Sequence, residues 1–222
     1  MGRRPIRARK TKATSIWTCK RVRKCVALAI GAMALSGCEG FTLGTPSVPV
    51  QKAAMLGGAV SLAGPDGYCI DVADSRLLRG FAIMAPCATL GLEGAGLPRA
   101  LGVITVQAGR NGTNAVAGTE PALAGLLSSQ AGAALLSRTG SADTIDVLST
   151  SSGDNKVTVY FEDKDGTPIA GTQDREWRGF IDLDGRLVTI SVRGLESAPL
   201  GSRAGAALLD TAISALFAEN ES

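Results

Sequence analysis

The chain has 222 residues, of which 45% are hydrophobic, so it is long enough for one folded domain or two small ones. It contains no histidine, the side chain most used for proton transfer near neutral pH and for binding zinc, which makes an enzyme less expected. The formal net charge is +3, but ten of the 23 Lys and Arg lie in residues 1–37, which hold no acidic residue. The remainder has 13 basic against 20 acidic residues, a net charge of −7, and only 4% of the chain is aromatic. An acidic domain with scattered cations and few aromatic rings argues against a nucleic-acid partner.

The basic N-terminal segment is followed by a short apolar run. This run, VALAIGAMAL, covers Val26–Leu35, about ten residues, whereas a membrane-spanning helix needs about 20. A basic region ahead of a short apolar run is typical of a secretory signal peptide. We therefore expect residues 1–37 to be an export signal.

The apolar run ends in Leu35-Ser36-Gly37-Cys38, which resembles the lipobox of bacterial lipoproteins. In that family the cysteine thiol receives a diacylglycerol, the peptide before it is removed, and the new N-terminus is usually acylated. The resemblance implies a lipid such as palmitate on Cys38, and several acyl chains together give a lasting membrane anchor. Glu39, in place of the Asp of inner-membrane lipoproteins, favours an outer-membrane over an inner-membrane address, facing the periplasm. The alternative is a buried N-terminal helix in which Cys38 is an ordinary core thiol.

The segment after Cys38 predicts a tether. Residues 39–50 contain Gly44, Pro46 and Pro49 and show neither a helical nor a strand period. We expect residues 38–56 to form the lipidated N-terminus and tether, and residues 57–222 to form a single domain.

The first strands of the domain are predicted between residues 59 and 107. Ala59–Ala63 and Tyr68–Val72 are short strand-like runs joined by Gly64-Pro65-Asp66-Gly67, a strong turn sequence, so we expect a hairpin. Phe81–Ala85 and Leu101–Gln107 add two further strands.

The pattern then changes to a helical one. Apolar residues recur at helical spacing through Glu120–Arg138, which predicts one helix with Thr119 as its N-cap and Gly140 at its end. Strands are expected at Thr144–Leu148 and Lys156–Glu162, and the Ser-rich residues 149–152 are interpreted as a loop.

The clearest hairpin joins Trp177–Leu183 to Arg186–Val192 through Asp184-Gly185. A two-residue Asp-Gly turn fixes the register of the two strands. In that register one face carries Trp177, Ile181, Val188, Ile190 and Val192, and the opposite face carries Arg178, Asp182 and Thr189. We expect the first of these faces to be buried.

The last predicted element is a helix over Ser202–Ala218 with Ser202 as its N-cap. Its apolar stripe consists of Ala206, Leu209, Ile213, Leu216 and Phe217. The chain therefore predicts an α+β fold, an antiparallel sheet of about six or seven strands with two helices packed on it.

Cys69 and Cys87 are the only cysteines after Cys38. In an oxidising compartment such as the periplasm an even pair predicts a disulfide, and closing so short a loop stabilises a fold by about 3 kcal/mol. A redox-active pair is more typically Cys-x-x-Cys.

No motif predicts a cofactor, a metal site or a catalytic residue. Asp163-Lys164-Asp165-Gly166 resembles a calcium loop only faintly, because the EF-hand spacing needs its Gly at the sixth position. The motifs Ser-x-x-Lys and Gly-x-Ser-x-Gly and the phosphate and dinucleotide loops are absent from the sequence. Asp182 and Asp184 lie at the predicted hairpin turn, where Asp is favoured for its geometry.

Two stretches carry a further resemblance. The segment Gly67-Tyr68-Cys69-Ile70-Asp71 with Cys87, and the later Trp177-x-x-Phe180 and Gly185-Arg186-Leu187-Val188, resemble a set of small, uncharacterised bacterial envelope lipoproteins. The order of elements over about residues 58–218 is also similar to the layout of Mog1/PsbP-type α+β domains. These resemblances imply a non-enzymatic accessory or binding role.

The expected function is that of a lipid-anchored envelope accessory protein without catalytic activity, which binds another envelope protein. The alternatives are a small-molecule-binding lipoprotein that serves a transporter and, third, an unrecognised hydrolase. A flat apolar patch of several hundred Å² would favour a protein partner. A deep apolar pocket with converging polar groups would favour a small molecule.

Overall fold

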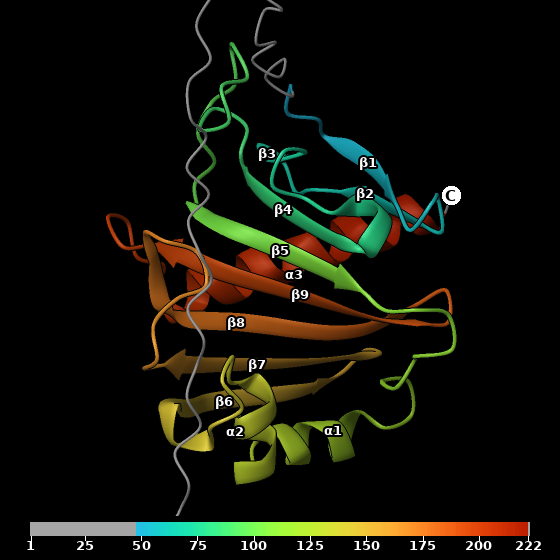
Figure 1. Ribbon diagram of the computed structural model, residues 1–222, viewed down its shortest axis with the longest axis vertical. Coiled ribbons are helices and arrows are strands. Elements are labelled where there is room, and N and C mark those ends of the chain that lie inside the picture. The colour runs from blue at the N-terminus through green and yellow to red at the C-terminus, as the bar shows by residue number, and fades with distance from the viewer. Residues whose placement is uncertain (1–47, 222) are drawn as a thin grey trace, which may run out of the picture. The chain divides into compact units, whose positions relative to one another are not determined.

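The computed structural model describes residues 48–221, so the predicted signal peptide and Cys38 lie outside the described residues. The described part has the predicted α+β architecture, built on a seven-stranded antiparallel sheet (Figure 1). The order of strands across this sheet is β3-β4-β5-β9-β8-β7-β6. Its strands are β3 (Tyr68–Ile70), β4 (Phe81–Pro86), β5 (Gly102–Ala108), β6 (Ile145–Gly153), β7 (Lys156–Asp163), β8 (Thr172–Leu183) and β9 (Arg186–Leu195).

The predicted Asp-Gly hairpin forms the centre of the sheet. Asp184 and Gly185 both have positive φ, 48° and 71°, as the two-residue hairpin turn requires, and Leu183 pairs with Arg186 across it. Trp177 lies opposite Val192, so the predicted register and its two faces are confirmed. The face with Trp177 is buried, because its side chains belong to the main hydrophobic core.

Helix α3 (Ser202–Asn220) covers this buried face and lies behind the sheet in Figure 1. Leu209 and Ile213 are buried as predicted, but Ala206 is exposed. The N-cap is Gly201 instead of Ser202. Gly205 allows the helix to approach the sheet closely, because a Cβ atom at this position would lie 2.4 Å from the indole ring of Trp177.

A separate two-stranded sheet corrects two predictions. Strand β2 (Val60–Ala63) pairs with β1 (Lys52–Met55), whereas β3 pairs with β4, so the predicted hairpin of residues 59–63 with 68–72 is wrong. The fold also begins before Gly57, because β1 lies within the predicted tether and its Met55 is fully buried. A four-residue strand is too short to show a period of its own, and its pairing depends on a turn at Leu56–Gly58, where all three φ angles are positive.

The opposite face of the sheet carries two short helices, α1 (Glu120–Leu127) and α2 (Gln130–Leu136), where one helix was predicted. The helix is interrupted at Ser128 and Ser129. The hydroxyl of Ser129 accepts a hydrogen bond from the N–H of Gly132 and so caps α2. Thr119 does not cap α1 with its side chain.

These two helices pack on β6 and β7 and form a second core cluster there. Residues 149–152, predicted as a loop, continue the edge strand β6 along β7.

Two 3₁₀ helices, η1 (Leu77–Arg79) and η2 (Ala142–Thr144), complete the described elements. Among residues 48–221, no helix packs closely on strands β4, β5 and β9 on the α1–α2 side. Within residues 48–221, no helix combines the length and the apolar character needed to cross a membrane.

Candidate functional site

A groove of about 480 Å³ lies where the α1–α2 pair ends and the uncovered sheet face begins. Its apolar lining consists of Phe81, Ala115, Leu123, Leu127, Leu135, Leu136, Phe180 and Leu187. Its polar lining consists of Thr105, Gln107, Arg178, Thr189 and Ser191. The volume falls within the range of about 300–1,000 Å³ that small-molecule sites occupy.

The alternation of the central strands produces the floor of this groove. Phe180 on β8 and Leu187 on β9 point away from α3, because the residues that follow them, Ile181 and Val188, are in the α3 core. Helices α1 and α2 supply the apolar wall, and Leu135 at its rim is 68% exposed. One side of the groove is therefore apolar, and its floor on the sheet combines apolar and polar side chains.

Arg178 is the one charged residue among the described residues that line this groove. Its Nε donates to Oε1 of Glu176 (2.6 Å) and to the hydroxyl of Ser191 (3.2 Å). Its Nη1 donates to the carbonyl of Leu136 at the end of α2 (3.4 Å), and its guanidinium carbon lies 5.0 Å from the ring centroid of Phe161. These contacts hold the guanidinium in one orientation at the floor.

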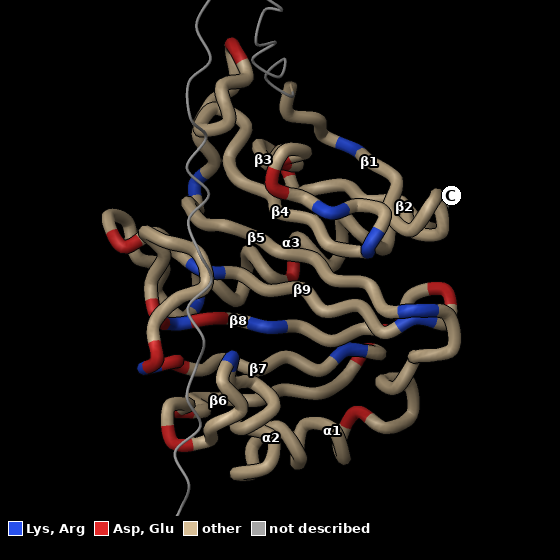
Figure 2. The backbone as a smooth tube through the Cα atoms, in the orientation of Figure 1, with Lys and Arg blue, Asp and Glu red and all other residues tan. Residues whose placement is uncertain are grey.

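Acidic and basic positions follow one another along β8 (Figure 2), and Glu176 of this strand pairs with two arginines in the interior. Its side chain is 2% exposed, and its second oxygen, Oε2, pairs with Nη2 of Arg193 at 2.5 Å. Arg193 is itself buried, and its Nη1 donates to the carbonyls of Gln173 (3.1 Å) and Asp174 (3.4 Å). We call Glu176, Arg178 and Arg193 the ion triad, and its two guanidinium groups and one carboxylate carry a net charge of +1.

The ion triad sets the protonation state of its carboxylate. Burial alone would raise the pKa of Glu176, but the charges of Arg178 and Arg193 and the hydrogen bonds from Arg178 and Ser191 outweigh burial. The net effect lowers the pKa of Glu176, so this residue is a carboxylate at neutral pH.

Sequence reasoning missed the ion triad, because charges at alternate positions of a strand usually face solvent. The register of the Asp-Gly hairpin could have predicted the ion triad. This register places Glu176 directly opposite Arg193 and leaves Arg178 two residues along the same face.

Asp182, which the sequence places near the hairpin turn, has a structural role. The carboxylate of Asp182 accepts hydrogen bonds from the backbone N–H groups of Ala115 (2.9 Å), Val116 (2.8 Å) and Ala117 (2.8 Å). Burial alone would raise the pKa of Asp182, but the three hydrogen bonds together have the larger effect. The net shift of the pKa is therefore downward. Asp182 therefore fixes the segment that enters α1, of which Ala115 lines the groove.

The weak calcium-loop pattern begins at the last residue of β7. Asp163 is 2% exposed at the end of β7, and its Oδ1 accepts a hydrogen bond from the N–H of Asp165 (3.0 Å). In the described part of the chain, no group of three or more His, Cys, Asp and Glu is placed to hold a metal ion.

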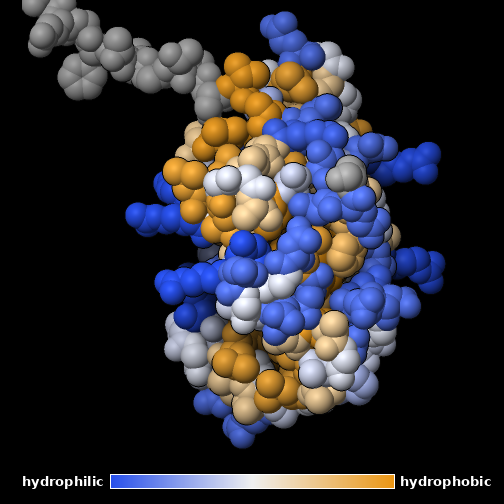
Figure 3. Space-filling model, turned by 90° about the vertical axis from the view of Figure 1, so that its right-hand side faces the viewer, coloured by the Kyte–Doolittle hydropathy of each residue, from blue (hydrophilic) through white to orange (hydrophobic). Residues whose placement is uncertain are grey.

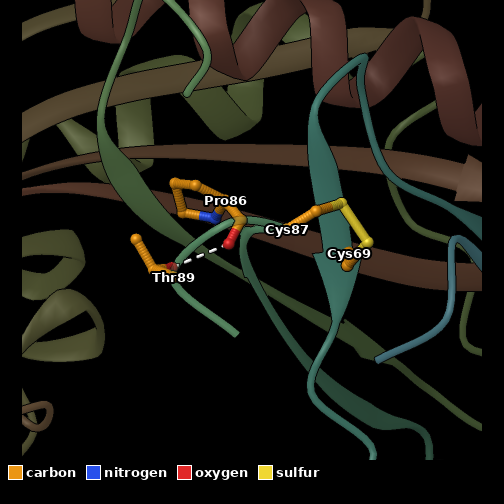
Figure 4. The surroundings of a disulfide bond; sticks show 4 residues. All are labelled: Cys69, Pro86, Cys87 and Thr89. Carbon is orange, nitrogen blue, oxygen red and sulfur yellow. Dashed lines mark hydrogen bonds between the residues drawn. A yellow bond between two sulfur atoms is a disulfide. The ribbon is translucent and has the colours of Figure 1, made fainter. Parts of the chain in front are cut away.

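The predicted disulfide between Cys69 and Cys87 is confirmed (Figure 4). It joins the edge strand β3 to the turn after β4, and the N–H of Cys87 donates to the carbonyl of Gly67 (2.8 Å). The hydroxyl of Thr89 donates to the carbonyl of Pro86 (2.7 Å) in the same turn. The bridge thus fixes an edge of the sheet.

No protein-family model matches this sequence, and no curated protein is significantly similar to it. Among solved structures, the Ran-binding protein Mog1p of Saccharomyces cerevisiae is 12% identical, with a TM-score of 0.41 over 76% of this chain and 92% of that chain. PsbP (CyanoP) of Synechocystis is 13% identical, with a TM-score of 0.40 over 82% of this chain and 96% of that chain. The expected similarity of layout to Mog1/PsbP-type α+β domains is therefore found, and it concerns the arrangement of elements alone.

Proposed function

We propose that this protein is a lipid-anchored envelope protein without catalytic activity that holds a small apolar or amphipathic molecule in the groove beside α1 and α2. The groove carries the proposal, because an apolar concave site with a few fixed polar groups at its base is typical of ligand binding. A flat docking surface is less well supported. On the side of the molecule drawn in Figure 3, hydrophilic side chains break the hydrophobic surface into separate patches.

The proposed location at a membrane of the cell envelope depends on Cys38. The lipobox-like Leu35-Ser36-Gly37-Cys38 supports lipidation of this thiol, and the Cys69–Cys87 disulfide suits an oxidising compartment such as the periplasm. Cys38→Ser should abolish incorporation of labelled palmitate and leave an unprocessed or soluble chain. Unchanged incorporation would show that the lipid is not on this residue.

A second candidate function has the same location in the cell envelope, but its binding partner is another envelope protein. Leu126 on α1 and Leu135 on α2 are 42% and 68% exposed, and large apolar side chains on neighbouring helices favour contact with a partner. Both candidates are binding roles, and they predict different adducts in a cross-linking experiment.

The experiment places a photoreactive amino acid at Leu135 in intact cells and analyses the adducts by mass spectrometry. The matched control is Arg203, an exposed position on α3 away from the groove. We expect small-molecule adducts at position 135 and none at position 203. Protein adducts at position 135 would support the second candidate, and equal labelling at both positions would contradict a groove ligand of either kind.

A further inference from the structure

We infer that the groove ligand is an amphipathic molecule with one acidic head group, a carboxylate on a single apolar chain, and that the head group binds Arg178. This inference rests on the proposed function and adds the chemical class of the ligand. It depends on where the charge of the ion triad is placed relative to the apolar wall.

The first step is the charge balance. One buried and one partly buried guanidinium group face a single carboxylate, so one positive charge has no carboxylate within the ion triad. Asp163 is also buried, at the end of the neighbouring strand β7, but among the described residues it forms no ion pair with Arg178 or Arg193. An excess charge in a poorly hydrated place is costly, and an anion that binds there lowers that cost.

The second step is access. Arg193 is 6% exposed at its side chain, whereas Arg178 is 21% exposed and lines the groove. The excess charge can therefore be reached from the groove through Arg178. The contacts with Glu176, Ser191 and Leu136 hold this guanidinium before a ligand arrives, so little side-chain entropy is lost on binding.

The third step concerns the shape of the ligand. A guanidinium group is planar and matches the geometry of a carboxylate, which favours this head group over a point-like charge. The rest of the lining is dominated by leucine and phenylalanine side chains, which suit an acyl or alkyl chain. About 480 Å³ is the size of a small-molecule site, which fits one such chain better than a lipid with several.

The test compares three probes with the same alkyl chain: dodecanoate, dodecanol and dodecylamine, each below its micelle concentration. Their dissociation constants are measured by calorimetry at neutral pH with the full chain carrying Cys38→Ser. We expect dodecanoate to bind about tenfold or more tightly than dodecanol, and dodecylamine to bind most weakly. This comparison uses one protein, so it does not depend on whether a variant folds.

Two variants locate the head group. Arg178→Met keeps an apolar stem and removes the charge, and it should abolish the preference for dodecanoate over dodecanol. Arg175→Met is the matched control, because Arg175 is on the same strand and pairs with Glu162 outside the groove lining. It should retain the preference.

The possible failures are distinguishable. Equal affinity for dodecanoate and dodecanol overturns the acidic head group and leaves a groove that binds apolar molecules. A preference that survives in Arg178→Met places the head group elsewhere and also overturns the inference. If none of the three probes binds, both the inference and the small-molecule form of the proposed function are contradicted.

Discussion

Replacing Glu176 with glutamine should destabilise the protein more than any other single change of charge in the described part. The variant keeps the size of the side chain and removes the carboxylate between Arg178 and Arg193. The amide oxygen of glutamine can accept a hydrogen bond from one guanidinium, but its NH₂ group would face the other. Two donors would then oppose each other in a site that is 2% exposed.

The expected loss is about 3–5 kcal/mol in the free energy of unfolding, the range for removing one partner of a buried ion pair. A protein of this size loses stability in urea at about 2 kcal/mol per molar, so the midpoint should fall by about 2 M. The pKa of Glu176 is lowered in the folded protein, so its contribution is present above the unfolded pKa and is lost as pH falls through the folded value. Wild type should therefore lose part of its advantage over Glu176→Gln in acid.

The assay is urea unfolding followed by circular dichroism, with the disulfide intact, in the chain carrying Cys38→Ser. Glu162→Gln is the control, because Glu162 pairs with Arg175 at 3.2 Å but both side chains are partly exposed, 31% and 55%. It should cost less than about 1 kcal/mol. A Glu176→Gln midpoint that matches that of Glu162→Gln would refute the view that the ion triad is a buried, coupled cluster.

Three further predictions concern the scaffold. Gly205→Ala should destabilise by about 1–2 kcal/mol in urea unfolding, because overpacking against the indole outweighs the gain in helix propensity, whereas Gly125→Ala, with open space around it, should stabilise by about 0.5–1 kcal/mol. Asp182→Ala should cost about 1–2 kcal/mol and speed amide exchange at the three N–H groups that its carboxylate holds, and unchanged exchange would rule out that role. Reducing the Cys69–Cys87 bridge, whose cysteines have a sequence separation of 18, should lower the unfolding free energy by about 3 kcal/mol, and an unchanged midpoint would contradict this.

Local chemistry explains the parts of the fold that could be predicted. The Asp184-Gly185 turn specifies its own hairpin, and that hairpin sets the two faces of the sheet. The cysteine count predicted the disulfide without knowledge of the pairing of β3 and β4. The spacing of Leu209, Ile213 and Leu216 identified the buried side of α3.

The parts that sequence reasoning missed depend on contacts between distant residues. Gly64-Pro65-Asp66-Gly67 is a turn, but the strands beside it pair with other partners, and no local pattern decides between the two pairings. The apolar period continues across Ser128 and Ser129, so the break between α1 and α2 is not visible from spacing.

The groove itself could not be predicted for a related reason. It exists because two short helices cover only the β6–β7 end of a seven-stranded sheet. Alternating strands indicate that a face is half-buried, but they do not tell which helix covers it or how far. Arg178 acquires its position only when β8, β9 and α2 come together.

Methyl NMR of the Cys38→Ser chain, titrated with dodecanoate, tests most directly whether the groove is the binding site. We expect the leucine methyl resonances of Leu123, Leu136 and Leu187, which line the groove, to shift together. Those of Leu209 and Leu216, which belong to α3 and are buried against the opposite face of the sheet, should stay in place. Shifts confined to the α3 core, or no shifts at saturating dodecanoate, would contradict the assignment of the groove as the binding site.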